Sequence, residues 1–150
     1  MRIEIPTADI RDHFTDTLKE RLKPFGLPFY EDSELLFWPH HFDGKSWATY
    51  SNGRVKGGTM RFREGLVRIP TANELPTYVT EERKAGLPPR AIVQIPGIVV
   101  CNAGEFTLEE LASDGFFSHE DMMEDMRHYY PNLQSNSVMS FYWFGKTRWM

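Results

Sequence analysis

Residues 56–61, with the sequence KGGTMR, hold the groups best suited to chemistry in this chain. Lys56 brings an amine, Thr59 a hydroxyl and Arg61 a guanidinium, all within six positions. A nearby amine can activate a threonine hydroxyl as a nucleophile, and a guanidinium carries a fixed positive charge. Such a cluster suits a phosphate, a nucleobase or an anionic intermediate.

Paired glycines, Gly57 and Gly58, separate the lysine from the threonine. Without a Cβ the backbone turns sharply there and a ligand can approach closely, so we count both among the candidate ligand-binding residues. Lys56 acts as a base only if burial or a neighbouring cation lowers its pKa; if it stays charged, it is an anion clamp. The alternative is an exposed hairpin with a solvated lysine, which the turn signal Asn52-Gly53 favours.

Tyr50 lies six residues before Lys56 and is a third candidate catalytic group. If the two residues flank one turn, the phenol faces the same cleft and can stack on a base or donate a proton. The alternative is a tyrosine packed in a strand.

The charge of the chain is uneven. The formal net charge is −4, whereas one segment of fifteen positions carries +4, from the following residues: Arg54, Lys56, Arg61, Arg63 and Arg68, with Glu64 opposing them. This asymmetry favours an anionic ligand, because an arginine can form two parallel hydrogen bonds to a phosphate and can also stack on a base. The alternative is a solvated strand face paired with acidic residues. The acidic helix near residues 119–130 would repel phosphate, so we expect it away from the cleft.

Length and composition predict one domain of 150 residues with an ordinary core. A single cysteine, Cys101, excludes an internal disulfide and fits a reducing compartment. No apolar run is long enough for a bilayer and the N-terminus lacks a signal-peptide pattern, so we expect a cytoplasmic protein without a membrane segment. No His or Cys spacing resembles a zinc site, and we expect no metal and no cofactor.

The predicted elements are short. An apolar stripe predicts a helix over 10–22 capped by Asp9, and residues 24–46 and 71–89 are expected to be irregular. A short strand is expected over 47–51, a strand pair over 60–70, and two strands over 90–101 broken at Pro96-Gly97. Capping patterns predict helices beginning near residues 107 and 118, followed by a strand over 137–144. The sum is an α+β domain of about five strands with two or three helices, which could close into a small barrel.

The pattern Gly53-x-x-Lys56-x-x-Thr59-x-Arg61 resembles the motif of the ASCH family in the PUA-like superfamily. The order of elements over 50–144 is also similar, including the turn Asp114-Gly115-Phe116 between two helices. The resemblance implies a PUA-like β-barrel over 46–144, with residues 1–45 as an N-terminal helix and extension. It also implies a cleft for nucleic acid or a nucleoside.

The resemblance carries functional expectations for individual residues. Some members of the family bind RNA, some cut single-stranded RNA, and some remove an acyl group from modified cytidine. In the deacylating branch the lysine and threonine correspond to Lys56 and Thr59. The glutamate of that branch falls near Asp114, where this chain has the shorter carboxylate.

Three functional hypotheses follow. The first is a domain that binds RNA or a nucleotide in a cleft lined by Tyr50, Lys56, Thr59, Arg61 and Arg63. The second is a hydrolase, either a ribonuclease acting on single-stranded RNA or an amidohydrolase acting on acylated cytidine. The third is a protein-interaction adaptor that uses the acidic helix and the aromatic segment 25–50.

Overall fold

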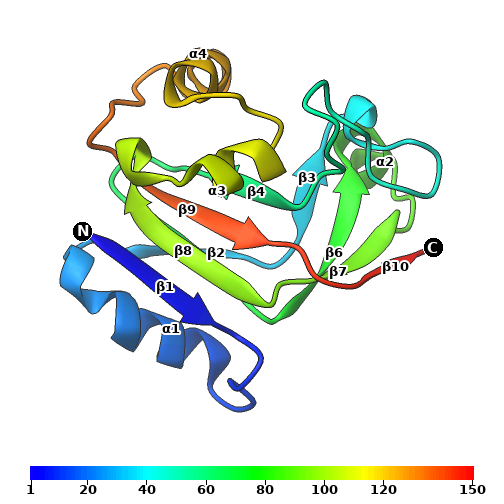
Figure 1. The fold of residues 1–150 in the computed structure, drawn as a ribbon. Coiled ribbons are helices and arrows are strands. Elements are labelled where there is room, and N and C mark those ends of the chain that lie inside the picture. The colour runs from blue at the N-terminus through cyan, green and yellow to red at the C-terminus, as the bar shows by residue number, and fades with distance from the viewer.

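The computed structural model describes all 150 residues, as an α+β fold with four α-helices and three sheets. The elements run in this order: β1 (Arg2–Pro6), α1 (Phe14–Leu22), β2 (Phe29–Asp32), β3 (Leu35–Phe37), β4 (Gly58–Arg61), β5 (Val67–Pro70), β6 (Glu74–Val79), α2 (Thr80–Lys84), β7 (Ala91–Gln94), β8 (Gly97–Asn102), α3 (Leu108–Ser113), α4 (His119–Tyr129), β9 (Val138–Trp143) and β10 (Thr147–Trp149). Figure 1 shows α3 and α4 on one side of the sheet that contains β8 and β9, and α1 on the other.

The predicted barrel is wrong. The strands form one antiparallel sheet in the order β1-β8-β9-β4, one mixed sheet in the order β10-β7-β6-β3, and a parallel pair β2-β5, and no sheet closes. Closure fails because β4 pairs only with β9, while β5 takes β2 as its partner in parallel. The expected strand pair over 60–70 is reduced to a single bridge between Arg63 and Leu66.

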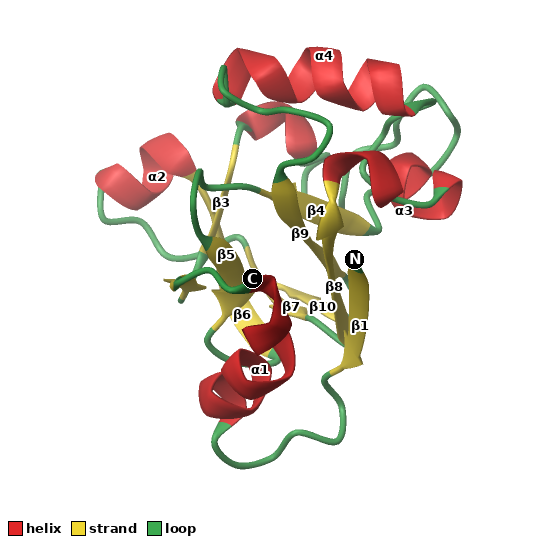
Figure 2. Cartoon of the chain, turned by 90° about the vertical axis from the view of Figure 1, so that its left-hand side faces the viewer, coloured by secondary structure: helices red, strands yellow, loops and turns green.

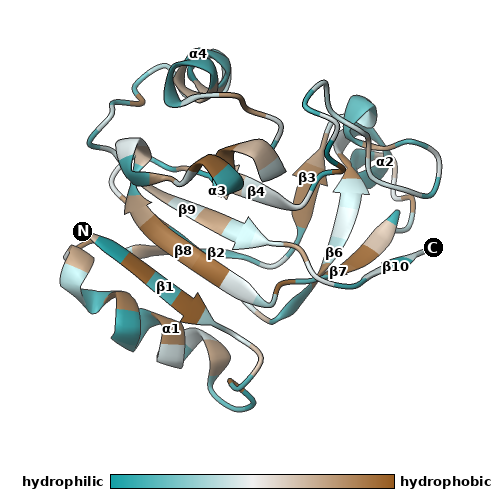
Figure 3. Ribbon diagram, viewed as in Figure 1, coloured by the Kyte–Doolittle hydropathy of each residue, from teal (hydrophilic) through white to brown (hydrophobic).

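The sheet β1-β8-β9-β4 is buried on both faces. Ile98 and Val100 of β8 belong to a core shared with α1, whereas Val99 and Cys101 belong to a second core on the α3–α4 side. Successive side chains of a strand point to opposite faces, so a run without polar residues fits a strand covered on both sides. Figure 3 shows the hydrophobic colouring continuing along β8, while α4 presents hydrophilic residues outward.

The first 45 residues are part of the fold. β1 pairs with β8 along its whole length, and Leu18 and Leu22 of α1 are fully buried. Figure 2, turned by 90°, shows α1 against the opposite side of the sheet from α3. The boundary predicted between an extension and a core at residue 46 therefore has no counterpart in the packing.

Local signals located several elements correctly. α3 begins after a complete capping box at Thr107 and Glu110, and α4 begins after Ser118, whose hydroxyl accepts a hydrogen bond from the Asp121 amide. The break at Pro96-Gly97 separates β7 from β8 as expected.

Other predicted elements differ from the structure. α1 begins at Phe14, not at residue 10, and His13 rather than Asp9 precedes it, with a left-handed φ of 54°. Residues 47–51 form only isolated bridges, whereas the segments expected to be irregular contain β2, β3, β6 and α2.

Candidate functional site

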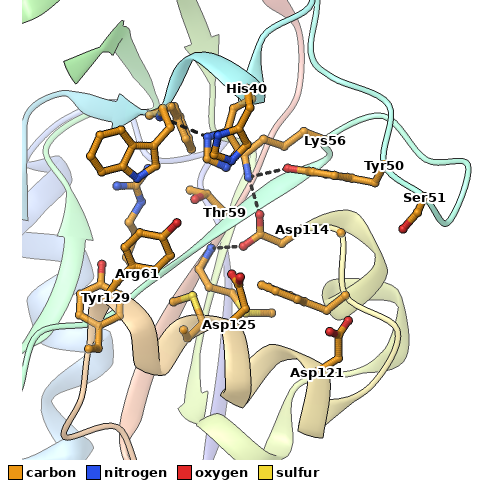
Figure 4. Close-up of a pocket in the computed structure, with 18 of the residues that line it drawn as sticks. His40, Tyr50, Ser51, Lys56, Thr59, Arg61, Asp114, Asp121, Asp125 and Tyr129 are labelled. Carbon is orange, nitrogen blue, oxygen red and sulfur yellow. Dashed lines mark hydrogen bonds and ion pairs between the residues drawn. The ribbon is translucent and has the colours of Figure 1, made fainter. Parts of the chain in front are cut away.

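A pocket of about 440 Å³ lies where β3, β4, the α3–α4 turn and α4 meet. Four of the predicted site residues line it together with the predicted carboxylate: Tyr50, Lys56, Thr59, Arg61 and Asp114. Figure 4 shows Lys56 and Tyr50 on one side of this pocket, Arg61 and Tyr129 on the other, and Thr59 between them. The residues come from segments far apart in the sequence.

A buried ion pair between Lys56 and Asp114 occupies one end of the pocket. The Lys56 ammonium donates to Oδ1 of Asp114 and to the hydroxyl of Tyr50, at 3.1 Å for the second bond. Oδ2 of Asp114 accepts a hydrogen bond from the Met60 amide at 3.1 Å, which ties the carboxylate to β4. Burial lowers the pKa of Lys56 more than the carboxylate raises it.

Burial raises the pKa of the Tyr50 phenol, and the nearby carboxylate of Asp114 adds to this shift. The phenol therefore stays protonated and keeps a hydrogen to donate toward the pocket. The ring of Tyr50 lies against Gly115, where an added Cβ would stand 2.9 Å from the ring and the φ of 90° disfavours other residues. Gly115 thus lets the tyrosine approach the α3–α4 turn closely.

Thr59 and Arg61 are two positions apart on β4, so both side chains face the pocket. Thr59 is only 4% exposed, and its hydroxyl makes no hydrogen bond to another protein group. The Nε of Arg61 is the one buried side-chain nitrogen or oxygen in the chain without a hydrogen-bond partner. Burial lowers the pKa of Arg61, and Arg68 acts in the same direction.

Aromatic side chains form much of the pocket wall. Phe37 of β3 contacts both cations, with its ring centre 5.0 Å from Lys56 Nζ and 4.8 Å from Arg61 Cζ. His41 packs edge-on against Phe37, and burial together with the charge of Lys56 lowers the pKa of His41 to about 3. The imidazole is therefore neutral near pH 7, and it accepts a hydrogen bond from the Trp38 amide.

The rim of the pocket exposes large apolar side chains. Trp38, Phe117 and Tyr129 are 44%, 62% and 50% exposed and all line the opening. Exposed aromatics gathered at one concave site are typical of ligand-binding surfaces. This grouping could not be predicted from the sequence, because the three residues come from separate segments.

The acidic helix does not lie away from the cleft, which corrects the prediction. Asp121 and Asp125 of α4 line the pocket, with Asp121 also accepting from the Phe117 amide at 2.9 Å. Partial burial and the charge of Asp114 raise the pKa of Asp125. These two carboxylates were the site residues that sequence reasoning placed elsewhere.

The predicted basic run does not form one surface. Lys56 pairs with Asp114, and Arg68 pairs with the buried carboxylate of Asp32 through two nitrogens. Arg63 is exposed, outside the pocket, with its guanidinium 4.5 Å from the ring centre of Tyr30. The charges therefore lie in separate places: Lys56 and Arg68 are paired and at least half-buried, whereas Arg54 and Arg63 are exposed without an ion-pair partner, so neither one basic surface nor a solvated, paired strand face describes the run.

Gly57 and Gly58 lie behind the pocket and do not line it. An added Cβ at Gly58 would stand 2.2 Å from the Phe141 ring, so the absence of a side chain serves packing between β4 and β9. Gly57 bonds through its amide to the carbonyl of Ser113 at 2.8 Å, which joins β4 to the end of α3. The glycines thus position Lys56 and Asp114 through the backbone.

No three His, Cys, Asp or Glu side chains lie close enough together to hold a metal ion. A helix that crosses a bilayer needs about 20 residues, and no helix in the structure has both that length and the apolar character.

No protein-family model matches this chain, and neither a curated protein nor a solved structure does.

Proposed function

We propose that the chain binds a single nucleoside or nucleotide in the pocket that contains Lys56, Asp114 and Thr59. The observation that carries this proposal is the convergence of a buried ion pair and a hydroxyl without a protein partner in one aromatic-walled cavity of about 440 Å³. A nucleobase needs flat apolar surfaces for its faces and fixed hydrogen-bonding groups for its edge. The exposed rings of Trp38, Phe117 and Tyr129 offer the first, and the hydroxyl of Thr59 offers the second.

The charge of the pocket favours a small ligand over a long RNA. Asp114 already neutralises Lys56, and Asp121 and Asp125 of α4 also line the pocket. A polyanion would meet these carboxylates, and the net charge of −4 gives no general attraction to a phosphate backbone. The resemblance of the Gly53–Arg61 stretch to the ASCH motif supports a nucleoside-type ligand independently of this argument.

A panel of ligands tests the proposal by equilibrium binding. It holds the common ribonucleosides, their monophosphates, cytidine acetylated on its exocyclic amine, and a short single-stranded RNA. We expect at least one nucleoside or nucleotide to bind, and Lys56→Met and Thr59→Val to weaken that binding about tenfold or more. Arg63→Gln, outside the pocket, is the control and should bind as the unchanged chain does.

Two outcomes would contradict the proposal. One is an absence of binding by every nucleoside and nucleotide in the panel. The other is tight binding of the RNA alone, with an affinity that falls steeply as salt rises and is lost in Arg63→Gln. That result would place the ligand on exposed basic residues outside the pocket, such as Arg63.

The second candidate function is hydrolysis of an acyl group carried by the nucleoside amine. The observation that favours it is the free hydroxyl of Thr59 in the same pocket as Lys56, an amine whose pKa is lowered by burial. The neutral form of Lys56 would take the proton of the hydroxyl while the threonine oxygen attacks the acyl carbon. The same proton would pass to the leaving nucleoside amine, and water would then cleave the threonine ester to release the acid.

In this candidate reaction Asp114 and Tyr50 are positioning residues. The carboxylate holds the lysine nitrogen, and the phenol takes a second bond to it at 3.1 Å. Incubation with acetylated cytidine, followed by chromatography, should yield cytidine and acetate, with turnover lost in Thr59→Val. Persistence of full turnover in that variant would remove Thr59 as the nucleophile, and cleavage of the RNA instead would favour the ribonuclease alternative.

A further inference from the structure

Arg61 is a half-buried cation without an ion-pair partner. Its Nε is shielded from solvent and makes no hydrogen bond, whereas every other side-chain nitrogen or oxygen that is shielded to this degree has a partner, and no carboxylate lies within ion-pair distance of the guanidinium. Burying an unpaired charge is costly, and structures normally compensate it with an opposite charge. The compensation is therefore missing from the protein itself.

Asp32, the carboxylate whose charge acts on Arg61, is already engaged, and so is Asp114. Asp32 accepts from Arg68 through both oxygens and from the Tyr142 hydroxyl at 2.7 Å. Asp114 is held by Lys56 and by the Met60 amide. Neither carboxylate is free to turn toward Arg61 without leaving another buried group unpaired.

The ring of Phe37 does not replace the missing acceptor. It stands 4.8 Å from Arg61 Cζ and gives the cation a favourable aromatic face. An aromatic face accepts no ordinary hydrogen bond from Nε, so the donors at the edge of the guanidinium remain available. Arginine presents these donors as a planar fork that matches the oxygens of phosphate and carboxylate.

A ligand can reach the guanidinium of Arg61 from the pocket. Arg61 lines the main pocket and also a neighbouring cavity of about 150 Å³, and Leu36 is the other residue common to both. In Figure 4 Arg61 lies across the pocket from Lys56, with Thr59 between the two cations. One ligand can therefore contact Thr59 with one part and Arg61 with another.

We infer that Arg61 binds an oxyanion, a phosphate or carboxylate, carried by the ligand of this pocket. The inference rests on the proposed function for the nucleoside part of the ligand. It narrows the ligand class to nucleosides that carry a phosphate or carboxylate group. The oxyanion would bind the terminal nitrogens of the guanidinium, which no protein group occupies and which, unlike the enclosed Nε, keep access to the pocket.

The test compares cytidine, cytidine monophosphate, inorganic phosphate and acetate by calorimetric titration and thermal unfolding. The variants are Arg61→Met and, as the matched control two residues away, Arg63→Met. We expect the monophosphate to bind the unchanged chain at least about tenfold more tightly than cytidine, and this preference to vanish in Arg61→Met alone. Inorganic phosphate or acetate should raise the melting temperature of the unchanged chain and of Arg63→Met, but not of Arg61→Met.

A second readout separates a binding role from a structural one. Without ligand, Arg61→Met should melt at a higher temperature than the unchanged chain, because the substitution removes a half-buried charge without an ion-pair partner and its enclosed, unbonded Nε. A lower melting temperature, with no response of the unchanged chain to any of the anions, would show that Arg61 serves packing against Phe37 and would overturn the inference.

The remaining outcomes distinguish the inference from the proposed function. Equal affinity for cytidine and its monophosphate would overturn the inference and leave the nucleoside pocket standing. Stabilisation by inorganic phosphate through Arg61, with no nucleoside or nucleotide bound, would support the inference and contradict the proposed function.

Discussion

Lys56 and Asp114 depend on each other at the residue scale. The lysine side chain is 1% exposed and the carboxylate 10% exposed, so neither charge has water to replace its partner. Such a pair adds little net stability compared with apolar residues, but removal of one partner leaves the other charge buried and unpaired. The pair therefore fixes the geometry of the pocket more than it stabilises the fold.

Breaking this pair should be costly. We expect Lys56→Met and Asp114→Leu each to lower the free energy of unfolding by about 3–5 kcal/mol, and the double variant to recover part of the loss. Urea unfolding of the two single variants and the double variant measures this coupling. Single losses below about 1 kcal/mol would mean that the pair behaves as a solvated surface bridge.

His41 should make stability depend on pH. Its pKa is about 3 in the folded protein against 6.5 ordinarily, because burial and the Lys56 charge disfavour the imidazolium. Between these values the unfolded chain binds more protons, so stability falls as the pH falls through this window. The loss from this group is up to about 2 kcal/mol between neutral pH and about pH 5.

Urea unfolding at the two pH values, in the unchanged chain and in His41→Gln, measures this contribution. The pH-dependent loss should shrink in His41→Gln and persist in His128→Gln, a substitution at an exposed histidine of α4. The same pH dependence in His41→Gln as in the unchanged chain would show that the imidazole is not the responsible group.

At the scale of elements, the contact between β4 and β9 is unusually close. Gly58 pairs with Trp143 in the ladder, and a Cβ at Gly58 would point at the ring of Phe141, two positions before Trp143 on β9. Lys56 and Thr59 lie on either side of this glycine. The distance between β4 and β9 at Gly58 therefore determines where their side chains enter the pocket.

An added methyl group at Gly58 should push the strands apart. We expect Gly58→Ala to lower the free energy of unfolding by about 1–3 kcal/mol, since the Cβ would stand 2.2 Å from a buried ring. Gly97→Ala is the control, because its Cβ would meet its nearest neighbour at 3.6 Å, an ordinary contact. Thermal unfolding of both variants measures the difference, and equal small effects would contradict the packing argument.

Elements with local signals were predictable from sequence, and elements made by distant pairing were not. The N-cap residues Thr107 and Ser118 predict the starts of α3 and α4, and Pro96 predicts the break between two strands. These predictions succeed because capping and proline act within a few residues of their own position. β2 and β3 pair in parallel with strands more than 35 positions away, and short segments rich in proline and aromatics do not reveal such partners.

The same distinction applies to the pocket. Thr59 and Arg61 were candidates because of their chemistry and the motif they share with Lys56, whereas Arg63, predicted beside them in the cleft, lies outside the pocket. The place of Asp114 came from a family resemblance and not from spacing. Asp125 was predicted to lie away from the pocket, because the pocket was expected to carry a basic surface that binds phosphate. Most of those basic residues are paired with carboxylates or lie outside the pocket, so an acidic residue can line it.

At the scale of the whole molecule, the N-terminal third completes both the sheet and the pocket. Leu18, Leu22 and Leu35 are fully buried in the core shared with β8, and Phe37 and His41 line the pocket. Arg2 forms an ion pair with Glu110, which is 1% exposed and belongs to the capping box of α3. We therefore expect the chain to unfold as one cooperative unit.

Removal of residues 1–45 should abolish folding. The shortened chain loses the edge strand β1, the helix α1 and two strands that pair in parallel with β5 and β6. We expect no cooperative thermal transition by near-ultraviolet circular dichroism. A cooperative transition of the shortened chain would support a separate core over 46–150.

The proposed function requires that Tyr50, Lys56, Thr59, Arg61 and Asp114 contact one ligand. An NMR titration of the labelled protein with cytidine monophosphate can show this, because every backbone amide reports its own surroundings. We expect the largest shifts at residues 50–61 and 113–117, followed by α4 amides near Asp125. Shifts confined to Arg63, Arg68 and their neighbours around Tyr30, or no shifts at saturating ligand, would rule this site out.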